Sequence, residues 1–376
     1  MKKKLLALCF RPPEIGYTQN SQGQYYILQR AQKMFETRIL SFKPLKLGEK
    51  GENYFDPNNS MIVKLFNFLF LGRSPRLTHY WSKSFYYAYR TMLEEFKPDI
   101  IYVDHLLLMQ YPLKYKPDAK IWLYNEESQL YIKKYNLRKN IFDLIKNIGL
   151  SDFEKKAISI ADKTLLITNQ ESKYLKSLGF NLVKTMPYSV DDKFFYTGWK
   201  TKQKIFSLLF IGDFSHQPNK EAAKLICNKI YPAIQNLQIK IILVGRNINE
   251  IKKYLNSKID IYEDVEDVRP FYWESTLFIA PIFSGAGMRI KILEAASCGI
   301  PILMTPLANL GVNLESSKEA FIENDISGMI ESIKNIYNSD GSDLVNVSLS
   351  ANKKVRSLFG IEKMNKLYDE IFSELL

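Results

Sequence analysis

Short apolar runs that end in polar turns recur along the whole chain, and this repetition constrains the fold more than any other feature. The runs lie at residues 5–10, 37–42, 98–105, 120–125, 163–168, 207–212, 239–245, 275–281 and 300–305. Segments with helical periodicity, such as residues 21–35, separate many of them. Strands that alternate with helices are typical of parallel sheets covered by helices. We therefore expect an α/β fold of doubly wound parallel sheets.

The length of the chain indicates two domains. One hydrophobic core serves up to about 250–300 residues, and this chain has 376. The strand pattern breaks at residues 186–192 and restarts after a polar, basic stretch. We expect one domain over residues 1–190, a second over 191–359, and a helix over 360–376 that packs at the domain junction or on the first domain. Its apolar residues fall on one side: Ile361, Met364, Leu367, Tyr368, Ile371 and Leu375.

The chain is basic, with 52 Lys and Arg against 40 Asp and Glu, a net charge of +12. Such an excess favours an anionic partner. A phospholipid surface and a sugar phosphate both qualify, whereas no nucleic-acid-binding motif is present. The three cysteines, Cys9, Cys227 and Cys298, are far apart and lie in apolar stretches. This spacing excludes a Cys-x-x-Cys metal pair and a disulfide framework, so we expect a cytoplasmic protein. The apolar run after the basic start is only about six residues long, too short for a signal peptide.

Basic and aromatic residues are interleaved between residues 61 and 90. The apolar run there is shorter than the roughly 20 residues that span a bilayer. Two interpretations are open. A helix on the inner face of the plasma membrane would use cations and aromatic rings together, and a core helix would keep only its basic flanks in solvent. The residues concerned are Lys64, Arg73, Arg76, Lys83, Trp81, Phe85, Tyr86 and Tyr87.

Residues 284–294 form a glycine turn that opens a helix between two strands. Gly285 and Gly287 let the backbone approach a diphosphate closely, and the free N–H groups of the first helical turn favour an anion. Arg289 and Lys291 place cations at the same helix end, where they are unfavourable unless an anion offsets them. Lys291 and Glu294 are three residues apart and share a helix face. The segment therefore predicts a phosphate site with a carboxylate beside it.

Polar residues also follow the strands of the first half. Ligands of open α/β sheets collect at the carboxyl ends of strands, where the chain has Asp104, His105, Tyr124, Asn125 and Thr168. A single polar residue in such a turn is also a common helix cap. The acidic run at residues 263–267 is better interpreted as a helix start than as a metal site.

The glycine turn resembles the Gly-x-Gly-x-Arg-x-Lys-x-Leu-Glu-Ala motif of family 4 glycosyltransferases. Similar segments follow the family's order at residues 210–213, 218–219, 244–246 and 265–272, and more loosely at 11–16, 124–128 and 187–191. The resemblance implies the GT-B fold, in which two Rossmann-like domains face each other across a cleft. It assigns the first domain to the acceptor and the second to the nucleotide sugar.

Carried over by position, the resemblance implies that Glu294 contacts the nucleotide ribose and that Arg289 and Lys291 neutralise the diphosphate. Gly212, Gly285 and Gly287 would border the donor, and Gly16 would lie in a first-domain loop that faces it. The resemblance implies neither a metal nor another cofactor.

Two positions depart from the family pattern. Ala286 stands where the first glutamate of the Glu-x7-Glu motif is expected, so the sugar hydroxyls need another partner. Tyr124 stands where a histidine often lies near the transferred sugar. A tyrosine is a poor general base at neutral pH, and His105 is the alternative candidate.

We expect transfer of a hexose-like unit from a nucleotide-diphosphate donor to a hydroxyl acceptor, such as a cell-surface or lipid-linked glycan. The resemblance implies retention of configuration, and without a nucleophilic carboxylate we expect front-face attack. Two alternatives are a sugar-nucleotide epimerase or hydrolase of the same architecture and a non-catalytic nucleotide-sugar-binding partner of another transferase.

Overall fold

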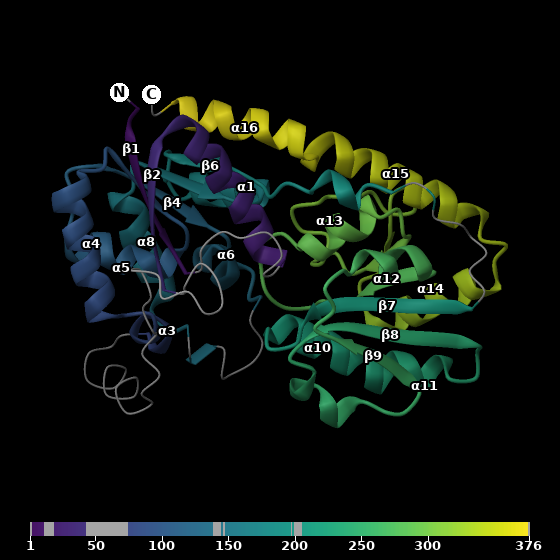
Figure 1. The fold of residues 1–376 in the computed structure, drawn as a ribbon. Coiled ribbons are helices and arrows are strands. Elements are labelled where there is room, and N and C mark those ends of the chain that lie inside the picture. Colours follow the sequence, from purple (N-terminus) through teal and green to yellow (C-terminus); the bar gives the residue numbers. More distant parts are fainter. Residues whose placement is uncertain are drawn as a thin grey trace. The chain divides into compact units, whose positions relative to one another are not determined.

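The computed structural model describes residues 2–10, 19–42, 74–137, 144–145, 147–196, 198 and 205–374. The chain divides into two compact units (Figure 1). The first unit comprises Met1–Tyr188 and Asn365–Leu376, and the second comprises Ser189–Met364. Each unit contains one six-stranded sheet in which the paired strands are parallel. The expected α/β fold of two doubly wound sheets is confirmed.

The sheet of the first unit has the order β2-β1-β3-β4-β5-β6. Its strands are β1 (Lys4–Cys9), β2 (Glu36–Ser41), β3 (Ile100–Val103), β4 (Lys120–Asn125), β5 (Lys163–Leu166) and β6 (Val183–Thr185). The central strand β3 is buried along its whole length. A run of apolar residues suits such a strand because both faces of a parallel sheet are covered.

Helices accompany this sheet along the chain. They are α1 (Gln19–Met34), α3 (Pro75–His79), α4 (Lys83–Phe96), η1 (Leu106–Met109), α5 (Gln110–Lys114), α6 (Gln129–Lys134), α8 (Leu150–Ile160), α9 (Asn169–Ser177) and η2 (Asp192–Phe194), the last in the second unit. Ser82 caps α4 by accepting a hydrogen bond from the Phe85 amide, and Thr168 caps α9 by accepting from the Glu171 amide. In both cases a side-chain hydroxyl satisfies a free backbone N–H group of the first turn, which favours a helix start at that residue.

The helix α4 has two different faces. Phe85, Tyr89 and Phe96 are buried in the core of the first unit, whereas Tyr87 is 61% exposed. Lys114 lies 4.8 Å from the ring of Trp81, next to this helix. Phe85, one of the aromatic residues considered for a membrane surface, is therefore part of the core. Lys64 and Arg73 lie outside the described residues.

The sheet of the second unit has the order β12-β11-β10-β7-β8-β9. Its strands are β7 (Phe206–Asp213), β8 (Ile239–Arg246), β9 (Ile259–Glu263), β10 (Leu277–Ala280), β11 (Ile302–Met304) and β12 (Phe321–Ile322). Its further helices are α10 (Gln217–Leu225), η3 (Ile226–Ile230), α11 (Tyr231–Ile234), η4 (Ile248–Glu250), η5 (Lys252–Tyr254), α12 (Arg269–Glu274), α13 (Ile290–Ser297), α14 (Ile326–Asn338) and α15 (Ser342–Phe359).

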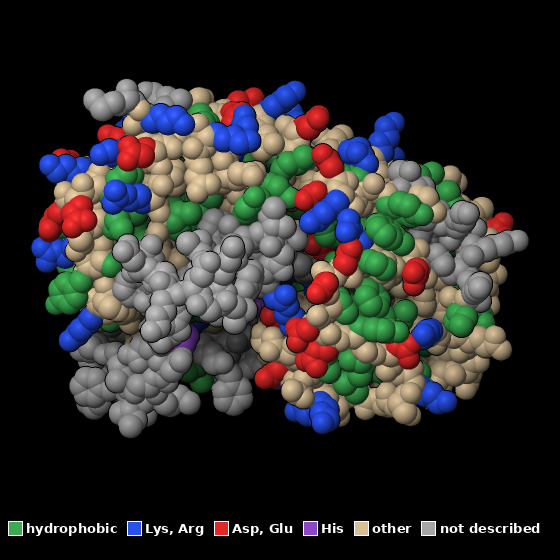
Figure 2. Space-filling model, in the orientation of Figure 1, with side chains coloured by type: hydrophobic (Ala, Val, Ile, Leu, Met, Phe, Trp, Pro, Cys, Tyr) green, Lys and Arg blue, Asp and Glu red, His purple; other side chains and the backbone are tan. Residues whose placement is uncertain are grey.

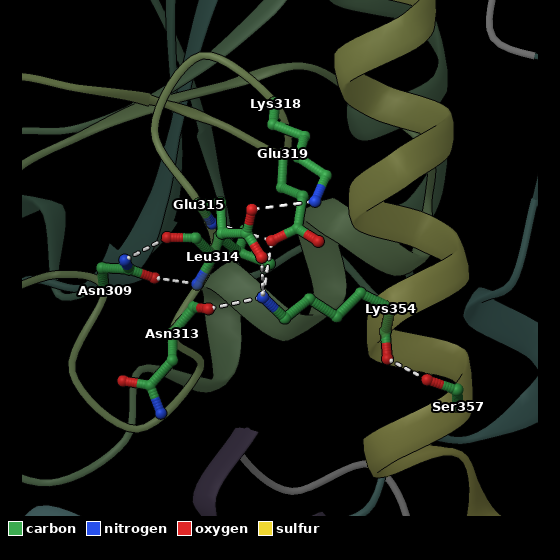
Figure 3. A network of polar contacts seen from close by, with 8 residues as sticks. All are labelled: Asn309, Asn313, Leu314, Glu315, Lys318, Glu319, Lys354 and Ser357. Carbon is green, nitrogen blue, oxygen red and sulfur yellow. Dashed lines mark hydrogen bonds and ion pairs between the residues drawn. The ribbon is translucent and has the colours of Figure 1, made fainter.

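A polar network ties the loop after β11 to α15 (Figure 3). Nζ of Lys354 on α15 donates to Oε2 of Glu319 at 2.6 Å and to the Asn313 carbonyl oxygen at 2.7 Å. The same Glu319 oxygen accepts from the Glu315 amide at 2.7 Å. The Glu319 side chain is only 8% exposed, so its charge is offset by these donors rather than by solvent.

The helix α16 (Ile361–Ser373) begins in the second unit and ends in the first. Its last turns complete the core of the first unit, where the Phe372 ring stacks on Trp122 with centroids 5.9 Å apart. Tyr368 donates to the Pro187 carbonyl oxygen at 2.8 Å. Arg30 also pairs with Asp369, and Lys163 and Lys184 pair with Glu374.

On the face shown in Figure 2, outside the grey residues, basic and acidic side chains are interspersed over both units. The excess of 12 positive charges therefore forms no single basic sector on that face. Among the described residues, no helix is both long and apolar enough to cross a membrane.

Candidate functional site

The glycine turn of the second unit connects β10 to α13 and has the predicted conformation for close approach. Gly285 and Gly287 have φ angles of 87° and 76°, which side chains disfavour. A Cβ atom on Gly285 would lie 2.9 Å from Nη2 of Arg289 and 3.1 Å from Cγ of Pro218. The turn therefore has no room for a side chain at this position.

Arg289 directly precedes α13 and closes the turn. Its guanidinium donates to the Ala286 carbonyl oxygen, to the Gly287 carbonyl oxygen at 3.5 Å and to the Ser284 carbonyl oxygen at 3.1 Å. The side chain is buried. Arg289 thus holds a positive charge at the start of α13, where the helix dipole is also positive.

Lys291 is the second residue of α13, and its side chain is buried, with an exposure of 5%. Its Nζ donates to the Ile211 carbonyl oxygen at 2.6 Å and to Oδ1 of Asn219 at 2.7 Å, and it lies 4.5 Å from the centre of the Phe210 ring. Burial and then the positive charge of Arg289 lower the pKa of Lys291 to about 7, although the charges of Glu294 and Asp213 act in the opposite direction. Two cations held this close in a buried place favour an anionic ligand.

Gly212 is the next-to-last residue of β7 and lies beside Lys291. A Cβ atom there would lie 2.8 Å from Nζ of Lys291 and 2.9 Å from the Asn219 amide. On the neighbouring strand, a Cβ atom on Gly245 would lie 1.7 Å from the Gly212 carbonyl oxygen. The two glycines therefore bring the ends of β7 and β8 together and leave space for the lysine.

Glu294 lies on the same helix, with an exposure of 2%. Its Oε2 accepts a hydrogen bond from the Tyr272 hydroxyl at 3.2 Å. Burial and then the nearby Glu294 raise the pKa of Tyr272 well above its usual range. The structure thus places four predicted donor residues, Arg289, Lys291, Glu294 and Gly212, within one unit and around one helix.

Two participants escaped the sequence analysis. Asn219 lies in a segment that resembles the family, but its role is visible only in the structure: it accepts from Nζ of Lys291 and donates to the Asp213 carbonyl oxygen at 2.8 Å. Glu221 on α10 accepts a hydrogen bond from the Ser284 hydroxyl at 2.6 Å. Both precede the glycine turn by more than 60 residues, so local spacing carries no signal for them.

Tyr124 and His105 lie in the first unit, at strand ends as expected. Tyr124 is fully buried, and its hydroxyl donates to the Met186 carbonyl oxygen at 3.3 Å. His105 accepts a hydrogen bond at Nδ1 from the Leu107 amide at 3.0 Å, which makes it the cap of η1. Burial lowers the pKa of His105 to about 3, with a smaller contribution from Arg76. Gly16 lies outside the described residues.

The other polar strand ends have structural partners. Nδ2 of Asn125 donates to Oε1 of Glu154 at 2.7 Å, and Oε2 of Glu154 accepts from the Leu130 amide at 2.6 Å. Thr168 donates to Glu171 at 2.6 Å. Asp267 accepts from the Arg269 amide at the start of α12, in line with the expected helix start. Within the described ranges, no group of three or more His, Cys, Asp or Glu side chains is arranged to hold a metal ion.

Comparison with known proteins supports this architecture. Residues 205–339 match the family described as Glycosyl transferases group 1. An uncharacterised 44.6 kDa protein in the cps region of Klebsiella pneumoniae is 23% identical over 264 residues, which is 67% of this chain and 64% of that protein. The match therefore spans slightly less than two thirds of the relative's length.

Solved structures share the fold at low identity. Sucrose-phosphate synthase from Thermosynechococcus elongatus has a TM-score of 0.76 and 12% identity, with 99% of each chain covered. WaaG, a glycosyltransferase involved in lipopolysaccharide biosynthesis, has a TM-score of 0.70 and 12% identity, covering 97% of this chain and 99% of that one. Anabaena Alr3699/HepE in complex with UDP-glucose has a TM-score of 0.64 and 12% identity, covering 98% and 99%. Residues 205–339 thus resemble the glycosyl transferases group 1 family, and the chain has the GT-B fold of two Rossmann-like domains.

Proposed function

We propose that this protein transfers a hexose-like unit from a nucleotide-diphosphate donor to a hydroxyl acceptor. The observation that carries the proposal is Lys291, a buried cation at the end of β7 with only neutral oxygen atoms as its hydrogen-bond partners. It lies on the helix that Arg289 and the glycine turn open. A diphosphate would add negative charge beside Lys291 and Arg289, beyond what Glu294 and Asp213 supply.

The proposed chemistry is electrostatic. Negative charge grows on the nucleoside diphosphate as the bond to the sugar breaks, and fixed positive charge at that place stabilises the transition state by several kcal/mol. Arg289, Lys291 and the start of α13 supply this charge, so we propose a reaction that needs no metal and no resident cofactor. We further propose front-face attack with retention of configuration. Glu294, next to Tyr272, is the proposed partner of the ribose.

The proposed acceptor is a cell-surface or lipid-linked glycan. The relative encoded in a cps region and the likeness to WaaG support this class. We propose that the protein is cytoplasmic and contacts the anionic inner face of the plasma membrane. The exposed Tyr87 on α4 and the cation of Lys114 beside Trp81 support that contact, because aromatic rings and cations together suit a lipid interface.

Thermal unfolding with UDP, GDP and their sugars tests the donor site. A ligand that binds the folded protein raises its melting temperature by mass action. We expect a rise with one nucleotide diphosphate, and we expect Lys291→Ala and Glu294→Ala to abolish it together with sugar transfer. Lys252→Ala, which removes an exposed lysine of the same unit, is the matched control. Full transfer by both site variants would contradict the assignment, and tight donor binding without turnover on any acceptor would favour a non-catalytic partner.

A further inference from the structure

Two carboxyl groups lie together in the first unit. Asp104 directly follows β3, and Glu126 directly follows β4, the strand that pairs with β3. The carboxyl ends of parallel strands meet at one edge of the sheet. Asp104 is 2% exposed, and Glu126 is partly buried. We refer to Asp104 and Glu126 as the acid pair.

Only one carboxylate oxygen of Glu126, Oε1, accepts hydrogen bonds from the described residues. Nε2 of Gln24 donates to Oε1 at 2.6 Å, and the Tyr188 hydroxyl donates to the same oxygen. Oε2 receives no hydrogen bond from the described part of the chain. The two donors fix the orientation of the carboxylate, so Oε2 is presented in a defined direction with an unused acceptor capacity.

Two other buried carboxylates of the first unit use both oxygens as hydrogen-bond acceptors, unlike Glu126. Glu154 accepts from Asn125 on Oε1 and from the Leu130 amide on Oε2. Glu171 accepts from the Ser128 amide on Oε1 and from Thr168 on Oε2. Both oxygens of these buried groups therefore serve the fold. The open oxygen of Glu126 has no such role.

Asp104 provides a second, independent observation. Its Oδ1 is fully buried and has no hydrogen-bond partner among the described residues. A buried polar atom without a partner is costly, and such atoms in native proteins commonly face a ligand or an ordered water. Burial and then the charge of Glu126 raise the pKa of Asp104 well above its usual range. Burial also raises the pKa of Glu126, to about 7, so both carboxyl groups of the acid pair hold their protons more readily than carboxyl groups in water.

The charge of the acid pair selects the class of ligand. A carboxylate oxygen beside a second carboxyl group repels a phosphate or another carboxylate. It accepts a hydrogen bond from a hydroxyl group, which is neutral and abundant on sugars. Burial favours the protonated form of Asp104, and in that form the carboxyl group can donate to a second hydroxyl oxygen of the same ligand. Neighbouring sugar hydroxyls match this combination of an acceptor and a donor.

We propose that the acid pair binds the acceptor through its sugar hydroxyls, with Glu126 accepting a hydrogen bond at Oε2 and Asp104 positioned beside it. This inference rests on the proposed function and adds the acceptor chemistry, an uncharged glycan end rather than a lipid phosphate. It also provides a contact in the first unit, where the Tyr124 hydroxyl donates to the Met186 carbonyl oxygen and Nδ1 of His105 accepts from the Leu107 amide.

Glu126→Gln is the decisive variant because its amide oxygen can still accept from Gln24 and Tyr188, whereas its NH₂ group cannot accept at the Oε2 position. Initial rates are measured with the donor that thermal unfolding identifies and with the octyl glycosides of glucose, galactose, mannose and N-acetylglucosamine. We expect the acceptor KM to rise roughly tenfold to a hundredfold, the usual effect of losing a hydrogen bond to a charged group. The donor KM and the melting temperature stay unchanged.

Two further variants separate binding from folding. Glu94→Gln makes the same chemical change at an exposed carboxylate of the first unit and leaves the acceptor KM unchanged. Glu126→Asp keeps the charge with a shorter side chain, so it restores part of the acceptor affinity that Glu126→Gln loses. An unfolded Glu126→Gln protein together with a folded Glu126→Asp protein of full acceptor affinity would overturn the proposal.

The remaining outcomes distinguish this inference from the proposed function. If wild type transfers sugar and Glu126→Gln keeps its acceptor KM within about twofold, the acid pair is not the acceptor site and the proposed function stands. If wild type binds neither UDP nor GDP and transfers to none of the glycosides, the proposed function itself fails. Loss of activity in Glu126→Gln through a higher donor KM alone would also overturn the inference.

Discussion

At the scale of single residues, the free protein holds Lys291 at a high electrostatic cost. Its pKa is about 7 in the folded state against 10.5 for an ordinary lysine. The unfolded chain therefore binds this proton more tightly, and the contribution of Lys291 to the free energy of unfolding rises as the pH increases from about 7 to 10.5. Below pH 7 the folded protein carries the full cost of the buried charge.

A bound diphosphate reverses this effect, because its negative charge raises the pKa of Lys291 again. We predict that UDP or GDP, whichever binds, takes up close to one proton at pH 8 and binds more weakly as the pH rises further. Calorimetric titrations in buffers of different ionisation enthalpy measure this uptake. Lys291→Met should lose the binding and the proton uptake together, and Lys252→Ala should leave both intact. Binding heats that are the same in every buffer would contradict the prediction.

Some contacts of the donor site can be predicted from the sequence, and others cannot. The motif predicts Arg289, Lys291 and Glu294 at one helix, because spacing along a helix is a local property. It does not predict that Lys291 meets Asn219 and Ile211, which are 72 and 80 residues away. Nor does it predict the contact of Glu126 with Tyr188, 62 residues apart. Only the order of strands in each sheet brings these partners together.

At the scale of elements, the ends of β7 and β8 approach more closely than any side chain would permit. We predict that Gly245→Ala lowers the free energy of unfolding by more than about 3 kcal/mol, since its Cβ would overlap the Gly212 carbonyl oxygen. Urea unfolding of the purified protein measures this loss.

Gly179→Ala is the control for Gly245→Ala. Gly179 also has a positive φ, of 92°, but a Cβ atom there meets nothing within 4 Å. Only backbone strain of about 1–2 kcal/mol is then expected. Equal losses in the two variants would show that the contact between the strand ends is unimportant.

The network of Figure 3 makes a second prediction at this scale. Lys354→Met removes the donor to Glu319, a carboxylate that is 8% exposed. We expect a loss of about 1–3 kcal/mol in the free energy of unfolding, the cost of a buried group without its partner.

Ser357→Ala provides the comparison for Lys354→Met. Its hydroxyl donates only to the Lys354 carbonyl oxygen within the same helix, at 2.9 Å. The expected change is within about 0.5 kcal/mol. A Lys354→Met protein as stable as this control would contradict the importance of the network.

Elements are also the scale at which the sequence predicts most. The apolar runs at 120–125 and 239–245 correspond to β4 and β8 within one residue, because a buried parallel strand needs an uninterrupted apolar stretch. The helix expected at 21–35 is observed at Gln19–Met34. The order of the strands is not contained in these runs, since each buried strand fits next to several others.

At the scale of the whole molecule, the first unit is built from two separate parts of the chain. Phe372 is fully buried against Trp122. We predict that Phe372→Ala destabilises the first unit by about 3–5 kcal/mol, the usual cost of a large cavity. The unfolding transition of the second unit should be unchanged. Ser373→Ala, next to it on the exposed side of α16, should have little effect. Hydrogen exchange resolves the two units, and equal loss of protection in both would contradict the prediction.

The divided first unit has a consequence for synthesis on the ribosome. Proteins commonly fold their N-terminal domain first as the chain emerges. Here the ribosome makes the entire second unit before it makes Asn365–Leu376. Until then, the first unit lacks the side chain of Phe372 in its core, although the second unit is already complete. The first unit's exposed apolar surface would be a target for chaperones. A chain whose translation stops after Met364 would contain every donor residue described above and still lack the side chain that packs against Trp122 in the first unit.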